Sequence, residues 1–337
     1  MGRRRRGRDI HGWLVVDKPV GPTSAALVSR VQYLINARKA GHAGTLDPLA
    51  SGLLAIAFGE ATKTVPAAQD GAKTYRFTAR LGQATTTDDA EGEIVATSAA
   101  RPTDADIHDA LTRFEGETRQ VPPLFSAVKH DGKRAYDLAR RAAQGEAVDL
   151  PDLVARPLIM HDIRLVDRPD ADHAVIEMRC GKGGYVRAVA RDLGRVLGCH
   201  AHVRALRRLA GGPFTISDAC DGAHLMRRDD DGRSGEACRG DAEPRDAALA
   251  ATIMAALRPV AAGLRDLPAI TLAPAEAEDL RLGRAVPVPQ PERSAIAEGH
   301  GGWAADPKGL PVALVEMRGG AIHPTRVIAP LSDRSEA

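Results

Sequence analysis

Apolar and polar positions near the start of the chain predict a strand, a helix and a second strand. His11 to Asp17 (HGWLVVD) is a short apolar run, which is typical of a buried strand. Thr23 or Ser24 then caps a helix whose apolar residues from Leu27 to Ile35 fall on one face. Lys73 to Leu81 alternates apolar and polar residues, so it is predicted to be a half-buried strand.

The middle of the chain continues this mixture of elements. Gln120 to Ser126 is a proline-stiffened strand or loop, Lys133 to Gln144 a basic helix, His173 to Cys180 a strand and Tyr185 to Leu197 a helix. The last helix is expected to point Val186, Val189, Ala190, Leu193 and either Val196 or Leu197 inward. Strands and helices alternate irregularly rather than as repeated βαβ units. We therefore predict an α+β fold with a mixed, largely antiparallel sheet.

The pattern changes after about residue 220, where we predict a domain boundary. Residues 221–245 are polar, glycine-rich and without periodicity, as in a flexible insertion, and an Ala-rich helical connection follows in 246–266. Four short strand signals in 267–332 predict a small β-rich domain: Pro268 to Leu272, Val286 to Pro289, Val312 to Met317 and Ile322 to Ile328. Residues 1–10 are predicted to be a basic disordered N-terminus, which leaves 11–220 as the large domain.

Composition fits a globular protein and excludes several classes. Of the 337 residues, 44% are hydrophobic and 27% charged, a balance that allows a substantial core. No apolar segment follows the basic start as in a signal peptide, and no run of apolar residues is long enough to span a membrane. We expect a cytoplasmic protein with no membrane partner. The four cysteines are widely spaced and form no zinc motif, so no metal is expected.

Positive charge is concentrated between Arg179 and Arg208, where eight basic residues face one acid, Asp192. Such a stripe can hold phosphates, although it can equally be the solvated face of a helix. Aromatic residues make up only 3% of the chain, which argues against a surface of many base-stacking rings. Recognition of a nucleic acid should therefore depend on shape and backbone charge.

The densest chemical signal is the string GHAGTLDPLASGLL at residues 41–54, which surrounds one carboxylate. Its glycines permit positive φ, and Pro48 disfavours the helical conformation at Asp47. Asp47 is therefore expected at a rigid turn. Taken alone, an Asp before a Pro is usually only a turn former.

This string resembles the catalytic motif of the bacterial tRNA pseudouridine-55 synthases, the TruB family. The resemblance continues in the family's order and covers most of residues 11 to 220. The further matching segments are LVVDKPVGPTS (14–24), KTYRFTARLG (73–82), QVPPLFSAVKHDGKRAYDLAR (120–140), CGKGGYVRAVARDLG (180–194) and LRRLAGGPF (206–214). The segment 267–288 is similar to the reduced PUA-like RNA-binding domain of the same enzymes.

The resemblance implies an activity and a catalytic set. Uridine 55 in the T loop of tRNA would be flipped out and isomerised to pseudouridine by cleavage and re-formation of its glycosidic bond. Asp47 would attack or stabilise the ribose C1′, Tyr75 would stack on the uracil and help to remove a proton, and Arg187 would pair with Asp47. No cofactor is implied. The enzyme would act as a monomer on tRNA without a guide RNA.

Two further groups of residues follow from the same resemblance. Lys18 and Pro19 would shape the site, and His42 would fill the stack that the flipped base leaves. Together with Gly44, Thr45 and Leu206, these residues would bind the substrate. The RNA backbone would be held by Lys129, Lys133, Arg134, Lys182, Arg204, Arg207 and Arg208.

Two alternatives remain open at this point. Archaeal and eukaryotic relatives share the Asp motif but act with guide RNA and accessory proteins, whereas the 120–140 segment here resembles the stand-alone branch. The chain could also be an RNA-binding module whose catalysis is vestigial, against which the intact Asp47, Tyr75 and Arg187 argue.

Overall fold

The computed structural model of the chain describes residues 7–126, 128–130, 133–143, 146, 148, 153–227, 246–288 and 294–330. Contacts between residues divide the chain into two compact units. Unit 1 comprises residues 1–48, 52–71 and 210–337, and unit 2 comprises residues 49–51 and 72–209. The domain boundaries expected from the sequence follow chain order instead, and they stay a prediction.

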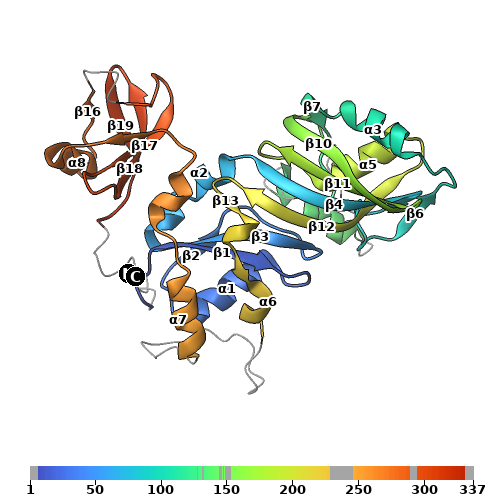
Figure 1. The fold of residues 1–337 in the computed structure, drawn as a ribbon, viewed down its shortest axis with the longest axis horizontal. Coiled ribbons are helices and arrows are strands. Elements are labelled where there is room, and N and C mark those ends of the chain that lie inside the picture. The colour runs from blue at the N-terminus through green and yellow to red at the C-terminus, as the bar shows by residue number, and fades with distance from the viewer. Residues whose placement is uncertain are drawn as a thin grey trace. The chain divides into compact units, whose positions relative to one another are not determined.

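The first strand of unit 1 is buried on both of its faces. β1 (Gly12–Lys18) runs antiparallel to β3 (Ala50–Phe58) and parallel to β14 (Cys220–Asp221), and β2 (Ala40–His42) pairs with β3 (Figure 1). Leu14 and Val16 pack in one apolar cluster, while Trp13 packs in another with Phe214. An uninterrupted apolar run in the sequence is the expected signature of such a strand.

Helix α1 (Ser24–Leu34) begins where the sequence predicts it. The side chain of Thr23 accepts a hydrogen bond from the backbone N–H of Ala26 at 3.1 Å, which satisfies one of the open donors of the first turn. Leu27 and Val31 are fully buried against β1. The other short elements of this unit, outside its C-terminal sheet, are η1 (Gly59–Lys63), α2 (Val65–Asp70), β13 (Phe214–Thr215), η2 (Ile216–Asp218), α6 (Gly222–Leu225), α7 (Ala247–Ala255) and η3 (Val260–Leu264).

Unit 2 contains a five-stranded antiparallel arrangement, shown side by side in Figure 1. Its order is β12 (Ala201–Gly211), β4 (Lys73–Leu81), β11 (His173–Cys180), β10 (Arg156–Asp170) and β7 (Gly116–Gln120). The strands β4 and β11 have the bounds that the sequence predicts. With the two parallel pairs of unit 1 and the C-terminal sheet, the expectation of a mixed, largely antiparallel α+β fold is confirmed.

Alternation along β4 gives this sheet a buried face and an open face. Tyr75, Phe77 and Ala79 are buried, whereas Arg76 is exposed and Arg80 half-buried. Helix α5 (Val186–Val196) contacts β4, and α3 (Asp104–Thr112) contacts β10 and α5. The inward face of α5 is confirmed except at its end, since Val196 is 41% exposed.

Two small hairpins complete unit 2. The hairpins are β5 (Gln83–Thr85) with β6 (Ile94–Thr97), and β8 (Lys129–His130) with β9 (Lys133–Arg134). Helix α4 (Ala135–Ala143) therefore begins two residues later than predicted, because the first two residues of the predicted helix pair in β9.

The C-terminal β-rich part has the sheet order β15 (Ala269–Thr271), β17 (Gly301–Ala305), β18 (Pro311–Arg318), β19 (Ala321–Val327) and β16 (Val286–Pro287). All four predicted strands are present. The sequence reading did not include β17, whose GGWAA sequence has little strand character. It also did not include α8 (Pro274–Arg281).

Two segments predicted to be irregular are partly described. At the N-terminus, Arg8 pairs with Ala37 and Ile10 is 5% exposed, so residues 8–10 are ordered, because they add a backbone pairing and an apolar side chain to unit 1. Of the predicted insertion 221–245, residues 222–225 form α6 and residues 228–245 lie outside the described part of the chain.

Candidate active site

The Asp47 loop, residues 43–48, belongs to unit 1 and is fixed on the N-terminal side of Asp47. The hydroxyl of Ser24 accepts a hydrogen bond from the backbone N–H of Leu46 and donates one to the carbonyl of the same residue, both at 2.9 Å. Ser24 is the first residue of α1, and Leu46 is 3% exposed. Helix α1 thus holds the residue that precedes the half-buried Asp47.

The residue that follows Asp47 is held as well. The carbonyl of Pro48 accepts a hydrogen bond from the backbone N–H of Gly21 at 2.8 Å and one from Nζ of Lys18 at 3.5 Å. Lys18 has no exposed surface, and its Nζ also donates to the carbonyl of Pro19 at 2.8 Å. The predicted Lys18 and Pro19 therefore lie against the Asp47 loop, as the sequence leads one to expect.

The other predicted residues of unit 1 lie close by in the chain. Gly44 has φ of 93°, which a residue with a side chain adopts only at a cost, so a glycine suits this position. Thr45 is exposed. His42 ends β2 opposite Ile56, and its carbonyl accepts a hydrogen bond from Gln69 at 3.4 Å.

Tyr75 belongs to unit 2, on the buried face of its sheet. It lies opposite Met178 in the register of β4 and β11 and is 8% exposed. Leu206, predicted as a wall of the pocket, is 9% exposed in β12, and its carbonyl accepts a hydrogen bond from the hydroxyl of Ser51 at 3.4 Å. Both residues have the burial that a uracil-binding wall requires.

Arg187 lies in the first turn of α5 with 7% of its surface exposed. Its guanidinium donates hydrogen bonds to the carbonyls of Phe125 at 2.8 Å and Thr87 at 3.3 Å. It also pairs with the carboxylate of Asp89 at 3.5 Å, and both side chains are at least nine-tenths buried. A buried guanidinium needs such partners, because an uncompensated charge is costly away from water.

Asp89 is a residue that the sequence reading missed. It is 3% exposed, and its Oδ1 accepts hydrogen bonds from the hydroxyl of Thr87 at 2.5 Å and from the backbone N–H of Glu91 at 3.0 Å. The signal in the sequence is TTTDDAEG directly after the predicted strand. Two adjacent acids in a turn resemble ordinary turn chemistry, however, and only folding shows that one of them faces Arg187.

A second arginine of α5 holds the other acid of this turn. Arg191 follows Arg187 by four residues, so both project from the same side of the helix. It pairs with Asp88 at 3.2 Å and donates to the carbonyl of Val121 at 2.8 Å. Burial raises the pKa of Asp88, and Arg191 partly offsets that effect. Asp88 itself has φ of 60°, which is uncommon for a residue with a side chain.

The predicted phosphate-binding residues have different surroundings. Lys182 and Arg204 are exposed and Arg207 is half-buried. Arg208 is 1% exposed, so in this structure it offers no surface to a phosphate, and its assignment to RNA binding is corrected. The backbones of Lys129, Lys133 and Arg134 form the β8–β9 hairpin, and their side chains lie outside what the structure describes.

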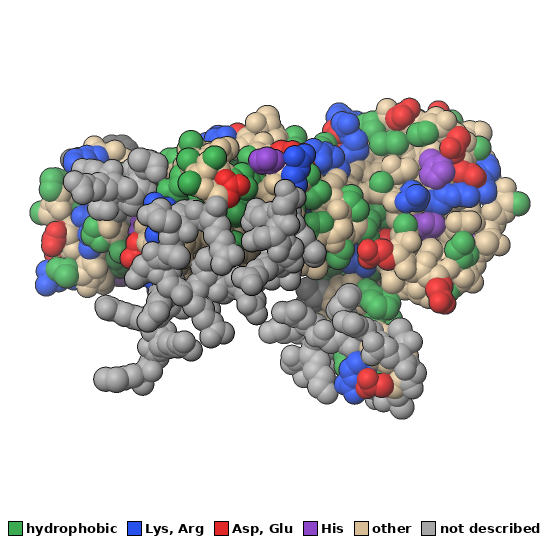
Figure 2. Space-filling model, turned by 90° about the horizontal axis from the view of Figure 1, so that it is seen from below, with side chains coloured by type: hydrophobic (Ala, Val, Ile, Leu, Met, Phe, Trp, Pro, Cys, Tyr) green, Lys and Arg blue, Asp and Glu red, His purple; other side chains and the backbone are tan. Residues whose placement is uncertain are grey.

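The expected basic stripe is not one continuous surface. Its members are divided among β11, α5 and β12, and Arg187 and Arg191 are occupied by acids of the 85–92 turn. On the face drawn in Figure 2, basic side chains occur in separate groups with acidic side chains among them. An RNA backbone would therefore meet local clusters of charge.

Two searches of the described residues gave no site. None of the described helices is long and apolar enough to cross a membrane. Among the same residues, no three His, Cys, Asp or Glu side chains are grouped so that they could hold a metal ion.

Comparison with known proteins gives consistent results. Residues 32–186 match the model of the TruB family pseudouridylate synthase N-terminal domain, and residues 187–263 match that of the tRNA pseudouridylate synthase B C-terminal domain. The chain is 53% identical to tRNA pseudouridine synthase B of Ruegeria sp. strain TM1040, over 97% of this chain and 99% of the relative. It is 50% identical to the protein of that name from Gluconacetobacter diazotrophicus, over 84% and 85%.

Solved structures extend the comparison to the fold. The chain resembles a protein of a Cbf5-Nop10-Gar1 complex with a TM-score of 0.67 and 24% sequence identity, over 95% of this chain and 85% of the other. At this level of identity, the similarity is one of fold. It agrees with the mixed α+β architecture described above.

Proposed function

Because the chain belongs to the TruB family of pseudouridylate synthases, we propose that it isomerises uridine 55 in the T loop of tRNA, with Asp47 as the catalytic carboxylate. The observation that carries this proposal is the double fixation of the Asp47 loop. Ser24 holds Leu46 before Asp47, and Gly21 and Lys18 hold Pro48 after it. A carboxylate that attacks one carbon atom gains most from such a fixed backbone.

The reaction is an intramolecular transfer that needs no cofactor. The target nucleotide leaves the stack, and Asp47 attacks or stabilises C1′ of the ribose as the bond from C1′ to N1 breaks. The detached uracil keeps the electron pair of that bond on N1, turns within the pocket and presents C5 to C1′. A bond from C1′ to C5 forms, N1 takes up a proton and C5 loses one, so the atoms of substrate and product balance.

Tyr75 and Arg187 serve different parts of this sequence. The ring of Tyr75 holds the detached uracil by stacking and assists removal of the C5 proton. Arg187 supplies a fixed positive charge that favours the ionised form of Asp47. Its burial and its pairing with Asp89 support this role, since a guanidinium held by three protein groups needs no rearrangement during the reaction.

The remaining predicted residues bind the RNA. His42 takes the position in the stack that the flipped base leaves, while Lys18, Pro19, Gly44, Thr45 and Leu206 shape the pocket. Lys182, Arg204 and Arg207, with Lys129, Lys133 and Arg134 of the hairpin, hold phosphates. The β-rich part from residue 267 adds affinity for tRNA as a PUA-like domain. The enzyme acts in the cytoplasm as a monomer and without guide RNA.

One experiment tests the proposal directly. Purified protein is incubated with unmodified tRNA and no other component, and pseudouridine is mapped along the product. We expect one modified position, uridine 55, and none in a tRNA that carries cytidine there. An isolated T stem-loop should also be modified, because the target and its recognition lie within that arm. Modification that requires an added guide RNA would contradict the stand-alone assignment.

A further inference from the structure

The open face of the unit 2 sheet carries a pocket that the proposed reaction does not use. It has a volume of about 370 Å³, and its polar lining includes Arg80, Gln83, Thr85, His173, His202 and Arg204. These residues come from β4, β5, β11 and β12, so the walls are held by neighbouring strands. Arg80 and Tyr75 are five residues apart on β4, an odd spacing that places them on opposite faces of the sheet.

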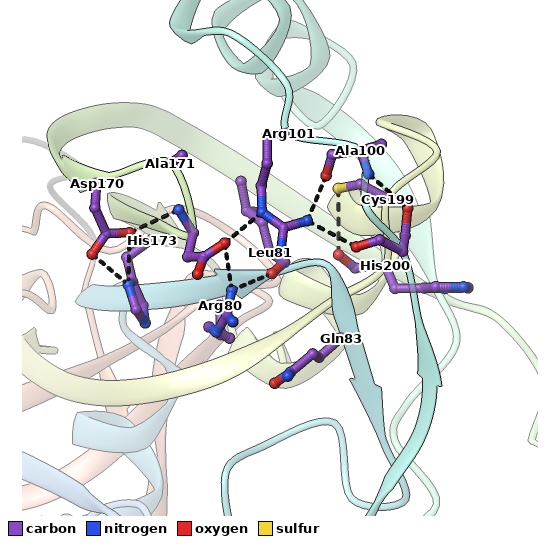
Figure 3. Close-up of polar contacts among 12 residues, drawn as sticks. Arg80, Leu81, Gln83, Ala100, Arg101, Asp170, Ala171, His173, Cys199 and His200 are labelled. Carbon is purple, nitrogen blue, oxygen red and sulfur yellow. Dashed lines mark hydrogen bonds and ion pairs between the residues drawn. The ribbon is translucent and has the colours of Figure 1, made fainter.

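The floor of the pocket is fixed by a shared ion pair at the end of the sheet. Arg80 pairs with Asp172 at 2.9 Å and donates to the carbonyl of Leu81 at 2.7 Å (Figure 3). Arg101 also binds the carboxylate of Asp172, as Figure 3 shows. One carboxylate thus serves two guanidinium groups, which leaves an excess of positive charge beside the pocket.

Arg204 adds a cation that lacks a carboxylate partner in the described part of the chain. It is exposed and lies on β12, two residues after His202 and therefore on the same face. Of the acids near this pocket, Asp170 lies 2.9 Å from the ring of His173 and Asp89 is paired with Arg187. The hairpin wall adds Glu91 and Glu93, which flank the lining residue Gly92 and are both exposed.

His202 links the charge of the pocket to its interior. Only 4% of the residue is exposed, and its Nδ1 lies 3.1 Å from the carbonyl of Gln83, to which a proton on Nδ1 would be donated. Burial lowers the pKa of His202, and the neighbouring Arg80 and Arg204 lower it further, while Asp89 acts in the opposite direction. An anion between the two arginines would weaken their repulsion of the protonated ring.

We propose that this pocket, between Arg80, His202 and Arg204, binds a phosphate group. Guanidinium groups match phosphate oxygens in geometry and charge, and a fixed pair of cations selects an anion over a neutral ligand. The phosphate can belong to the RNA backbone or be free inorganic phosphate. In the first case the proposal rests on the proposed function, because the RNA would then be tRNA bound at a second place on the enzyme.

The first test uses inorganic phosphate and the full-length protein without RNA. The ring signals of His202 are followed by NMR during a phosphate titration at several pH values. We expect a saturable shift and a higher pKa of His202 in the bound state, so that phosphate binds more tightly as the pH falls through that pKa. The exposed Arg204→Gln should weaken phosphate binding by roughly tenfold, since it removes one charge-assisted contact.

Arg156→Gln is the matched control, because Arg156 is an exposed arginine of β10 that does not line the pocket. It should change phosphate affinity by less than about twofold. A His202 signal that does not respond to phosphate, or an equal response in wild type and Arg204→Gln, would overturn the proposal. Because no uridine is present, this result is independent of the isomerase assay.

The second test identifies the source of the phosphate. Affinity for tRNA is measured by filter binding with wild type, Arg204→Gln and Arg156→Gln at one fixed salt concentration. A several-fold loss only with Arg204→Gln supports an RNA phosphate at the pocket. If Arg204→Gln weakens inorganic phosphate binding and leaves tRNA affinity unchanged, the pocket is a site for free phosphate, and its use by tRNA is excluded.

Discussion

The Asp47 loop and the surroundings of Arg187 show two ways of fixing a charged residue. On either side of Asp47, the backbone is held by hydrogen bonds from a serine hydroxyl, a backbone N–H and a lysine. Arg187 is instead held through its own side chain, by two carbonyls and by the buried carboxylate of Asp89.

The difference lies in what each support demands of the rest of the fold. Loss of one hydrogen bond near Asp47 leaves the other contacts in place, so the loop should change position only slightly. Loss of Asp89 leaves a buried positive charge without its counter-ion, which costs several times more than a lost neutral hydrogen bond. The Asp47 loop should therefore tolerate single substitutions that the Arg187 network does not.

The largest effect should come from removing the carboxylate that the loop holds. Asp47→Asn should lower the single-turnover rate of pseudouridine formation by at least about three orders of magnitude, because it removes the group that acts on C1′. Affinity for tRNA should change little, which filter binding would measure. A variant that retains a tenth of the wild-type rate would falsify the assignment of Asp47.

Asp89→Asn should break the Arg187 network. We expect the free energy of unfolding to fall by about 3 kcal/mol, since Arg187 stays buried with a weaker partner. Urea denaturation measures this change. Asp192→Asn is a matched control on the same helix, because Asp192 is 28% exposed in its pairing with Arg191 and should contribute less than about 1 kcal/mol. Equal losses in the two variants would contradict the importance of the buried pair.

Ser24→Ala tests the support of the Asp47 loop. It should slow the single-turnover rate by roughly tenfold, because Leu46 loses both of its hydrogen bonds to Ser24 and Asp47 is positioned less well. Unfolding should require about 1–2 kcal/mol less. Thr23→Ala is the control: it removes the cap of the same helix and costs about 1 kcal/mol of stability. If both variants lose rate equally, the effect comes from the helix and not from Leu46.

The smallest effect concerns pH and the neighbouring pair of Asp88 and Arg191. Because the pKa of Asp88 is raised in the folded state, the stability contribution of this group is fully present below its unfolded pKa of about 3.9. That contribution is lost as the pH rises through the folded pKa. The stability of wild type relative to Asp88→Asn should therefore decrease between about pH 4 and pH 7, as measured by urea denaturation. An increase over this range would contradict the raised pKa.

The sequence predicted the Asp47 loop better than the Arg187 network, for a physical reason. The loop depends on residues that are adjacent in the chain, and its unusual backbone is written in Gly44 and Pro48. The strand that carries Tyr75 was likewise readable from local alternation. The pairing of Arg187 with Asp89 joins positions far apart in the sequence, and no local pattern encodes it.

Burial of charged residues was the other point that local patterns did not predict. Arg208 lies in a run of basic residues, which suggests an exposed surface, and yet it is buried in β12. The strand itself was not predicted, because its arginines and alanines have no clean alternation. Which face of such a strand is covered depends on the elements packed against it, and these are fixed only by the fold.

Lys18 has a consequence for chemical labelling of the protein. Its amine is fully buried and bonded to the carbonyls of Pro19 and Pro48, so an amine-acylating reagent in solution cannot reach it while these contacts last. Labelling at this position should therefore proceed only during the moments when the loop opens. The ratio of its acylation rate to that of the exposed Lys182 would report how often the segment around Asp47 comes apart, in the free protein and with RNA bound.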